Sequence, residues 1–166
     1  MKKLKILTGV DNPVLRTVSR PVAVFDANLK KFVKQLKDAM IKARGIGIAA
    51  PQVGVNIRVF LVILDYGKRN ERTVPMVNPK ILSFSKKMEV DEEGCLSVPG
   101  IYGTVERAKS IVVEFYDLEG IRYEMDLEGL NAREVQHELD HLDAILFVDK
   151  MIEEVTYEEG DETPQI

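Results

Sequence analysis

The sequence predicts an α+β fold, with antiparallel or mixed β-sheets packed around a central helix and a further helix near the N-terminus. Apolar residues recur every three or four positions from Asp26 to Gly45, which is the spacing of a helix with one buried face. Short apolar or alternating runs between turn residues follow from residue 57 onwards, as in strands. Helical spacing returns near residue 137, in a segment rich in potential metal ligands.

The composition is that of an ordinary folded domain. The 166 residues are 45% hydrophobic and 30% charged, and the formal net charge is −4. We expect one domain over residues 1–151, followed by an acidic tail over residues 152–166 that frays. The negative charge argues against nucleic-acid binding through bulk electrostatics. No apolar run reaches about 18 residues, the length of a membrane helix, so no membrane partner is expected.

The N-terminal helix is expected to begin after Asp26, because aspartate accepts backbone N–H bonds at helix starts. Its apolar stripe consists of Leu29, Phe32, Val33, Leu36, Met40 and Ala43. Gly45 is the expected helix stop and opens the segment G-I-G-I-A-A-P-Q-V-G, which ends at Gly54. Taken locally, this segment is a tight connection, although its small residues also allow another chain to approach closely.

The strands are expected in the middle of the chain. The run 57–64 is almost continuously apolar, as in a buried strand. Further strands are expected at 73–78 and 86–91. A hairpin is expected over 111–127, because Gly120 can adopt the positive φ of a bulged turn.

The central helix holds His137 and His141, the two histidines of the chain, with Glu138 between them. Side chains four residues apart leave the same face of a helix, so both imidazoles can reach one divalent metal. A neighbouring carboxylate can then handle the proton of a metal-bound water. The pattern H-E-x-x-H is short, and a helix with two ordinary histidines is the alternative interpretation. Asn131 is the expected N-cap of this helix.

Cys95 is the only cysteine, which excludes an internal disulfide and suits a reducing compartment. It lies in the glycine- and proline-containing segment E-G-C-L-S-V-P-G. A lone cysteine is usually a small buried apolar residue. With the two histidines, however, it would complete the three protein ligands of a catalytic metal site. A thiolate and two imidazoles suit Zn²⁺, Fe²⁺, Ni²⁺ or Co²⁺ rather than Mg²⁺ or Ca²⁺.

Three segments in series resemble the signature motifs of peptide deformylases, in the same order and at comparable spacing. They are G-I-G-I-A-A-P-Q, E-G-C-L-S and Q-H-E-L-D-H-L. The similarity begins with D-N-P-V-L-R and runs to about Met151. It implies a hydrolase that removes the N-formyl group from the initiator methionine of new polypeptides and releases formate. It also implies nascent chains, with the ribosome, as partners, in the bacterial cytoplasm or an organelle.

The resemblance implies a metal site and a catalytic set. The metal ligands would be Cys95, His137 and His141. The native ion would be Fe²⁺, with Zn²⁺, Ni²⁺ or Co²⁺ as substitutes. Glu138 would be the general acid and base, while the side chain of Gln52 and the backbone N–H of Leu96 would stabilise the developing oxyanion.

It also implies residues that bind substrate and residues that support the site. The substrate would lie against Gly45, Ile46, Gly47 and Gly94. A salt bridge between Glu93 and Arg107 would steady the cysteine segment; an ordinary surface pair is the alternative.

Several positions depart from the family pattern. Ala144 stands where many members carry a glycine that ends the helix with positive φ. Arg133 and Glu134 stand where some members carry apolar residues on the substrate-facing side, and Tyr102 stands where others carry arginine. These departures bear on peptide preference rather than on the chemistry.

Two other functions remain open. An H-E-x-x-H endopeptidase would need an oxygen ligand such as Asp143 or Asp149, because the chain has no third histidine. A relative without turnover would bind only peptide or metal, but the presence of Gln52, Glu138 and all the expected ligands argues against it.

Overall fold

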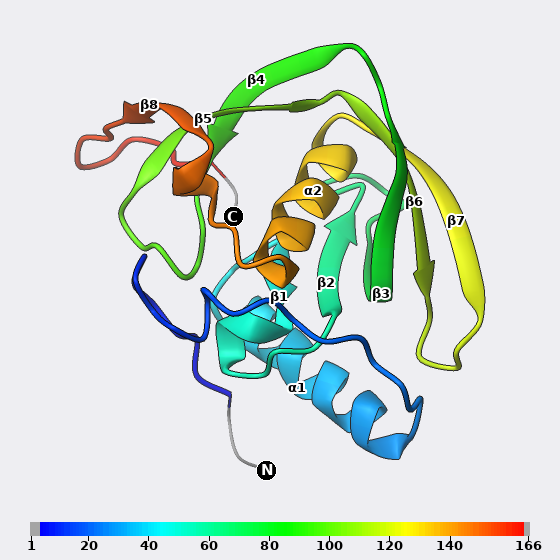
Figure 1. Cartoon of the computed structure of the whole chain (residues 1–166). Coiled ribbons are helices and arrows are strands. Elements are labelled where there is room, and N and C mark those ends of the chain that lie inside the picture. The colour runs from blue at the N-terminus through cyan, green and yellow to red at the C-terminus, as the bar shows by residue number, and fades with distance from the viewer. Residues whose placement is uncertain (1–3, 165–166) are drawn as a thin grey trace.

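The computed structural model describes residues 4–164, which form two helices, two 3₁₀ turns and eight strands. Their order is α1 (Ala27–Lys42), β1 (Gly47–Ala49), η1 (Ala50–Val53), β2 (Val59–Leu64), β3 (Arg72–Phe84), β4 (Met88–Glu93), β5 (Tyr102–Ala108), β6 (Ser110–Tyr116), β7 (Arg122–Glu128), α2 (Leu130–Leu142), η2 (Phe147–Asp149) and β8 (Met151–Val155). Figure 1 shows α2 at the centre and α1 outside the sheet.

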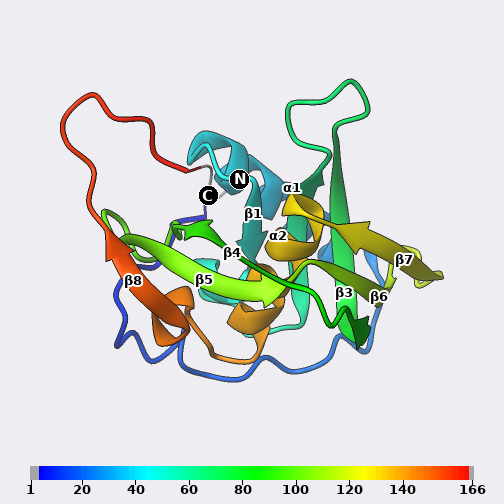
Figure 2. The ribbon, with the colours of Figure 1, turned by 90° about the horizontal axis from the view of Figure 1, so that it is seen from above.

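The strands form two antiparallel sheets. Five strands pair in the order β1-β2-β3-β6-β7, and three pair in the order β4-β5-β8. Viewed from above, α2 lies between β5 of the small sheet and β1 to β3 of the large one (Figure 2). The expected fold class, with sheets around a central helix and an N-terminal helix, is therefore confirmed.

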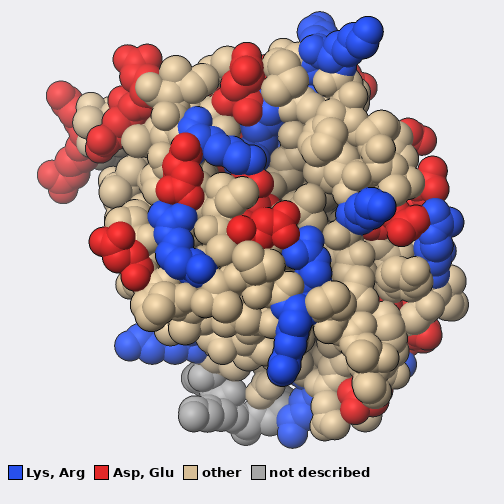
Figure 3. Space-filling model, viewed as in Figure 1, with Lys and Arg blue, Asp and Glu red and all other residues tan. Residues whose placement is uncertain are grey.

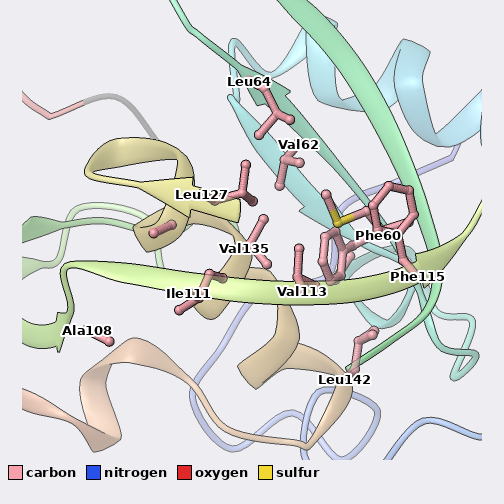
Figure 4. Close-up of a cluster of buried hydrophobic side chains, with 13 residues drawn as sticks. Phe60, Val62, Leu64, Ala108, Ile111, Val113, Phe115, Leu127, Val135 and Leu142 are labelled. Carbon is pink, nitrogen blue, oxygen red and sulfur yellow. The ribbon is translucent and has the colours of Figure 1, made fainter. Parts of the chain in front are cut away.

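Two apolar clusters hold these layers together. One lies between α2 and the large sheet, where Val135 sits among Phe60, Val62 and Val113 (Figure 4). The other packs α1 against the opposite side of β1 and β2, and includes Leu36. A fully buried side chain of this size contributes roughly 1.5–3 kcal/mol to folding. The clusters thus fix α2 rigidly against the sheet, which matters because α2 carries the histidines.

The start of α1 is as expected, but its end is not. The Asp26 side chain accepts hydrogen bonds from the backbone N–H groups of Asn28 and Leu29, each at 2.9 Å. The helix ends at Lys42, and the left-handed conformation after it belongs to Arg44, with φ of 59°. The expectation that Gly45 takes this role was wrong.

Neither end of α2 has the capping residue that is usual for a helix. Asn131 lies inside the helix and not at its cap, because its amide binds the backbone N–H and the carboxylate of Asp65 after β2. Gly129 occupies the N-cap without a side-chain hydrogen bond. At the other end Ala144 adopts φ of 62°, a conformation that costs a non-glycine residue about 1–2 kcal/mol.

The expected strands exist, but they are longer or shifted, and three others were missed. The run 73–78 is the first half of β3. The hairpin corresponds to β6 and β7. Strands β1, β5 and β8 were not predicted. They are short or polar, and pairing with distant strands defines them.

The expected boundary of the tail needs correction. Strand β8 crosses it, and Val155 pairs with Tyr102 of β5. Beyond β8, the ring of Tyr157 lies edge-on to that of Tyr102, with 5.1 Å between centroids, and its hydroxyl donates to Glu92. Acidic side chains gather over this part of the surface, whereas elsewhere on the same face both signs are interspersed (Figure 3). Neither helix in the described part combines the length and apolar character needed to cross a bilayer.

Candidate metal centre

Three side chains from two segments converge between the sheets. Cys95 follows β4, and His137 and His141 lie one turn apart on α2. Their ligand atoms all lie within 4.8 Å of one another, and each residue is at most 7% exposed. The Cys95 Sγ lies 3.2 Å from the His141 Nε2.

This donor set fits a divalent transition-metal ion. Metal–sulfur bonds near 2.3 Å and metal–nitrogen bonds near 2.0 Å place the donors of one tetrahedral ion roughly 3.5 Å apart. The observed separations are compatible with that spacing. Burial holds the pKa of His141 well below its usual value. Its ring is therefore neutral, which is the form that binds metals.

Glu93 orients one of the histidines. Its Oε2 lies 2.9 Å from the His137 Nδ1, so the Nε2 of that ring is left for a cation. Burial raises the pKa of Glu93, but hydrogen bonds from Arg107 and His137 outweigh it and hold that pKa well below its usual value. The carboxylate is therefore ionised throughout the physiological range.

Glu93 belongs to a buried group of charges that we call the Arg107 network, made of Glu93, Arg107, Arg133 and Asp140. Arg107 donates to Glu93 and, at 2.8 Å, to Asp140. Arg133 donates to Glu93 at 2.8 Å and to the carbonyl of Val105 at 2.9 Å. Glu93 and Arg107 are 4% and 3% exposed, so they are not an ordinary surface pair. The network connects β4, β5 and α2 at the level of the metal ligands.

Glu138 is buried and directly follows the ligand His137 on α2. Among the described residues, none forms a hydrogen bond with its Oε2. Burial raises its pKa to about 8. A Cβ on Gly47 would lie 2.9 Å from the Glu138 Cδ and closer still to one oxygen. Glycine at position 47 is therefore what gives this carboxyl its room.

The Gln52 side chain points at the same site from η1. Its Oε1 accepts from the backbone N–H of Ala49 at 2.8 Å, which fixes the orientation of the amide. Its Nε2 lies 3.6 Å from the Cys95 Sγ and 3.2 Å from the Ser97 Oγ. The backbone N–H of Leu96 donates to no residue within the described range. The Leu96 N–H is thus a donor without an acceptor next to the cysteine, whereas the Gln52 amide already donates to the Cys95 sulfur and to Ser97.

The residues expected to face substrate lie in two parts of the structure, at strand β1 and in the wall of a cavity. Gly47 begins β1, which is an edge strand of the large sheet. Gly45 and Ile46 directly precede it, and Ile46 is only 1% exposed. Gly94 lies elsewhere, in the wall of a cavity of about 220 Å³ that also includes His137.

The family resemblance placed Gly94, Arg133 and Glu134 towards the substrate, but sequence reasoning did not identify the cavity that they line. Its wall includes Leu130, Arg133 and Glu134 of α2, and Pro164 of the tail. The available signal was helical spacing, because Glu134 precedes His137 by three residues and so shares its face of the helix.

Comparison with known proteins gives a consistent result. The family model described as polypeptide deformylase matches residues 4–156. A peptide deformylase from Caldicellulosiruptor bescii is 45% identical over 156 residues, covering 94% of this chain and 90% of that protein. A solved peptide deformylase from Acinetobacter baumannii, with Met-Ala-Ser bound, superposes with a TM-score of 0.83 at 37% identity, covering 90% of this chain and 99% of that one.

A plant relative is longer. The chloroplastic peptide deformylase 1B of Solanum lycopersicum is 45% identical over 153 residues. The matched region covers 92% of this chain but only 54% of the tomato protein. The chain therefore spans about half the length of that relative.

Proposed function

Because this chain belongs to the peptide deformylase family, we propose that it hydrolyses the N-formyl group of the initiator methionine of newly made polypeptides and releases formate. The observation that carries the proposal is the convergence of Cys95, His137 and His141 within 4.8 Å, with the Glu138 carboxyl beside them. Metal ligands and an adjacent proton acceptor are what hydrolysis of an unactivated amide requires.

Cys95, His137 and His141 would hold one divalent ion. We propose Fe²⁺ as the native ion, with Zn²⁺, Ni²⁺ or Co²⁺ as substitutes, because one thiolate and two imidazoles favour these metals over Mg²⁺ and Ca²⁺. When bound, the ion supplies Lewis acidity, which lowers the pKa of water and polarises the formyl carbonyl.

Glu138 is the proposed general base and acid. A carboxyl whose pKa is raised to about 8 has a much higher proton affinity than an exposed one. It can therefore take a proton from the attacking water and later deliver it to the departing amine. Gly47 leaves space for the carboxyl at this point.

Gln52 and Leu96 are the proposed oxyanion donors. As the formyl carbon becomes tetrahedral, its oxygen gains negative charge, and the Gln52 Nε2 and the Leu96 N–H can donate to it. The amide of Gln52 is already fixed by Ala49, so little reorganisation is needed. Each donor of this kind contributes roughly 3 kcal/mol to transition-state stabilisation.

The substrate is proposed to lie along β1. An extended peptide can add to this edge strand through backbone hydrogen bonds, with Gly45, Ile46 and Gly47 facing it and Gly94 beside its first residue. The Acinetobacter baumannii relative carries a bound Met-Ala-Ser peptide, which supports a site for methionine-led chains. A formyl group carries only hydrogen on its carbon, so a tight site can exclude larger acyl groups.

Two features argue against an endopeptidase. Within the described residues, the only group of three or more metal-ligating side chains is the Cys95 site. Asp143 forms an ion pair with Arg58 at 2.7 Å, and Asp149 forms one with Arg16, so neither aspartate is free to bind a metal.

The proposed partners are formylated nascent chains, in a bacterial cytoplasm or an organelle where translation starts with formyl-methionine.

The proposal is tested by purifying the protein without oxygen, measuring its metal content and assaying formate release from formyl-Met-Ala. Acetyl-Met-Ala is the matched control substrate. We expect one metal ion per chain, formate from the first peptide and no hydrolysis of the second. Internal cleavage of longer peptides without formate release would contradict the proposal.

A further inference from the structure

The chain turns sharply directly after α2, at Ala144, whose φ of 62° lies in the left-handed region that favours glycine. The backbone N–H of Ala144 donates to the carbonyl of His141 at 3.3 Å, and that of Ile145 donates to the carbonyl of Asp140 at 2.9 Å. These two bonds form a Schellman motif, in which a left-handed residue closes the helix. The conformation of Ala144 therefore determines how the last turn of α2, which carries His141, ends.

The same turn sets the direction of the segment that follows it. Leu146 and Phe147 are 0% and 1% exposed and belong to one apolar cluster with Cys95. The ring of Phe147 lies against that of His137, with 6.3 Å between the centroids and an angle of 28° between the planes. The turn thus affects the surroundings of all three metal ligands, because it ends the helix at one and directs residues 146–147 towards the other two.

An alanine does not favour this turn by itself. In the left-handed conformation its Cβ comes too close to the following carbonyl oxygen, a contact that glycine avoids. At Ala144 the conformation therefore has to be held by contacts from other parts of the chain.

Arg16 and Asp149 provide such contacts. The Arg16 Nη1 donates to the carbonyl of Ala144 at 3.4 Å and to the Asp149 Oδ2 at 2.5 Å, while its Nη2 donates to the Asp149 Oδ1 at 3.0 Å. Its Nε donates to the carbonyl of Val10 at 2.7 Å. Asp149 also accepts from the backbone N–H of Leu146 at 2.9 Å. The pair thus binds the backbone on both sides of the turn.

This pair differs from an ordinary surface ion pair. The two side chains are 32% and 38% exposed, and exposed ion pairs usually contribute little. A two-pronged bond between arginine and carboxylate, with further bonds to the backbone, is the stronger exception.

We propose that Arg16 and Asp149 act as a clamp that keeps Ala144 left-handed and thereby positions the metal ligands. The proposal rests on the proposed function, because it takes the three ligands as the site of a catalytic ion. Arg16 is a positioning residue, since within the described chain none of its hydrogen bonds goes to a ligand. Without the clamp the turn leaves the left-handed conformation part of the time, and the apparent metal affinity falls with the fraction of molecules whose site is correctly formed.

The test measures the affinity for Co²⁺, by competition with a chelating indicator, in the wild type, Arg16→Met, Ala144→Gly and the double variant that combines both changes. Ala144→Gly removes the Cβ that opposes the left-handed conformation, so the clamp is no longer needed. Arg122→Met is the matched control, because Arg122 also binds carboxylates, those of Glu114 and Glu124, but lies on β7.

Arg16→Met should bind Co²⁺ roughly tenfold more weakly than the wild type, because the preference of alanine against the left-handed conformation corresponds to a factor of that order. The visible absorption bands of bound Co²⁺ respond to the geometry of its ligands and should broaden in this variant. Ala144→Gly, the double variant and Arg122→Met should all bind Co²⁺ as the wild type does.

Wild-type affinity in Arg16→Met would overturn the inference, and so would a weakened affinity that Ala144→Gly does not restore. The second result would show that Arg16 does not act through the turn. If thermal unfolding shows that Arg16→Met is not folded, Arg16→Lys takes its place with and without Ala144→Gly, since lysine keeps the charge but not the two-pronged geometry. The same two outcomes then overturn the inference.

Failure of the proposed function gives a different result, because the wild type would then bind Co²⁺ without releasing formate from formyl-Met-Ala. The affinities of the variants would still decide whether the clamp exists. A wild type that binds no Co²⁺ would overturn both proposals.

Discussion

Two regions that meet along α2 hold buried carboxyl groups in opposite electrostatic states. In the Arg107 network, Glu93 is 4% exposed and its pKa is held well below its usual value. On α2, Glu134 beside the cavity and Glu138 beside Gly47 are 7% and 2% exposed, and their pKa values are raised to about 7 and about 8. Burial is similar in the two regions. The difference comes from the supply of donors. Arg107, Arg133 and His137 bind the Glu93 carboxylate, whereas none of the described residues donates to the carboxyl groups of Glu134 and Glu138.

Adjacent residues on one helix make the contrast plain. Arg133 turns its guanidinium into the network, while Glu134 lines the cavity without a partner. The network thus behaves as support, because each charge in it is paired. The cavity wall, by contrast, contains the unpaired carboxyl of Glu134 beside the paired Glu93 and Arg133.

The largest effect is expected at Glu138, whose carboxyl lies against Gly47. Glu138→Gln preserves the size of the side chain but removes the proton acceptor, so formate release should fall by about 10²–10⁴-fold. Metal content, measured by elemental analysis, should stay at the wild-type value. A metal-free variant would show instead that Glu138 belongs to the supporting structure.

The next effect concerns the network. Arg107→Met leaves Glu93 and Asp140 short of a buried partner, and should lower the free energy of unfolding by about 3–5 kcal/mol. Urea unfolding of the metal-free protein measures it. Lys30→Met is the control, because the ion pair between Lys30 and Glu119 is about half exposed and should contribute little. Equal losses in the two variants would remove the distinction between network and surface.

A pH series separates the two regions further. A carboxyl with a raised pKa binds its proton more tightly in the folded state, so its stability contribution is lost as pH rises from about 4.5 through about 7. Glu134→Gln cannot ionise and should avoid this loss, which amounts to about 3 kcal/mol. Urea unfolding of both metal-free proteins at pH 5 and pH 8 checks it. A stability difference that does not change between these pH values would contradict the expected proton on Glu134.

The smallest effect is expected in the tail, which reaches the cavity wall at Pro164. Tyr157→Ala removes the edge-on contact with Tyr102 and should cost about 1 kcal/mol of unfolding free energy. Thermal unfolding measures this loss, with Tyr157→Phe as the control that keeps the ring. If both variants unfolded together, the hydrogen bond to Glu92 and not the ring contact would anchor the tail.

Local pattern was enough to predict the helices and the segments that carry the metal ligands. The stripe of α1, its cap at Asp26 and the spacing of His137 and His141 depend on residues a few positions apart. Such regularities are visible in sequence because one helix turn brings those side chains together.

What the sequence did not reveal depends on contacts between distant segments. The Asn131 side chain could accept the hydrogen bonds of a helix N-cap, but it is bound instead by Asp65, which lies in a distant segment. Strand β8 forms because it pairs with β5, although its acidic sequence predicted a frayed tail. The pKa of Glu134 on α2 depends on donors that already bind Glu93, which lies on β4. None of these outcomes is encoded within a short window of sequence.

The central claim is that Cys95, His137 and His141 bind a single cation, and Co²⁺ binding tests it most directly. Titration of the metal-free protein should saturate at one ion per chain, with a near-ultraviolet charge-transfer band from thiolate to cobalt. That band should be absent in Cys95→Ser. A wild-type titration with no thiolate band, or a Cys95→Ser spectrum identical to that of the wild type, would contradict the claim.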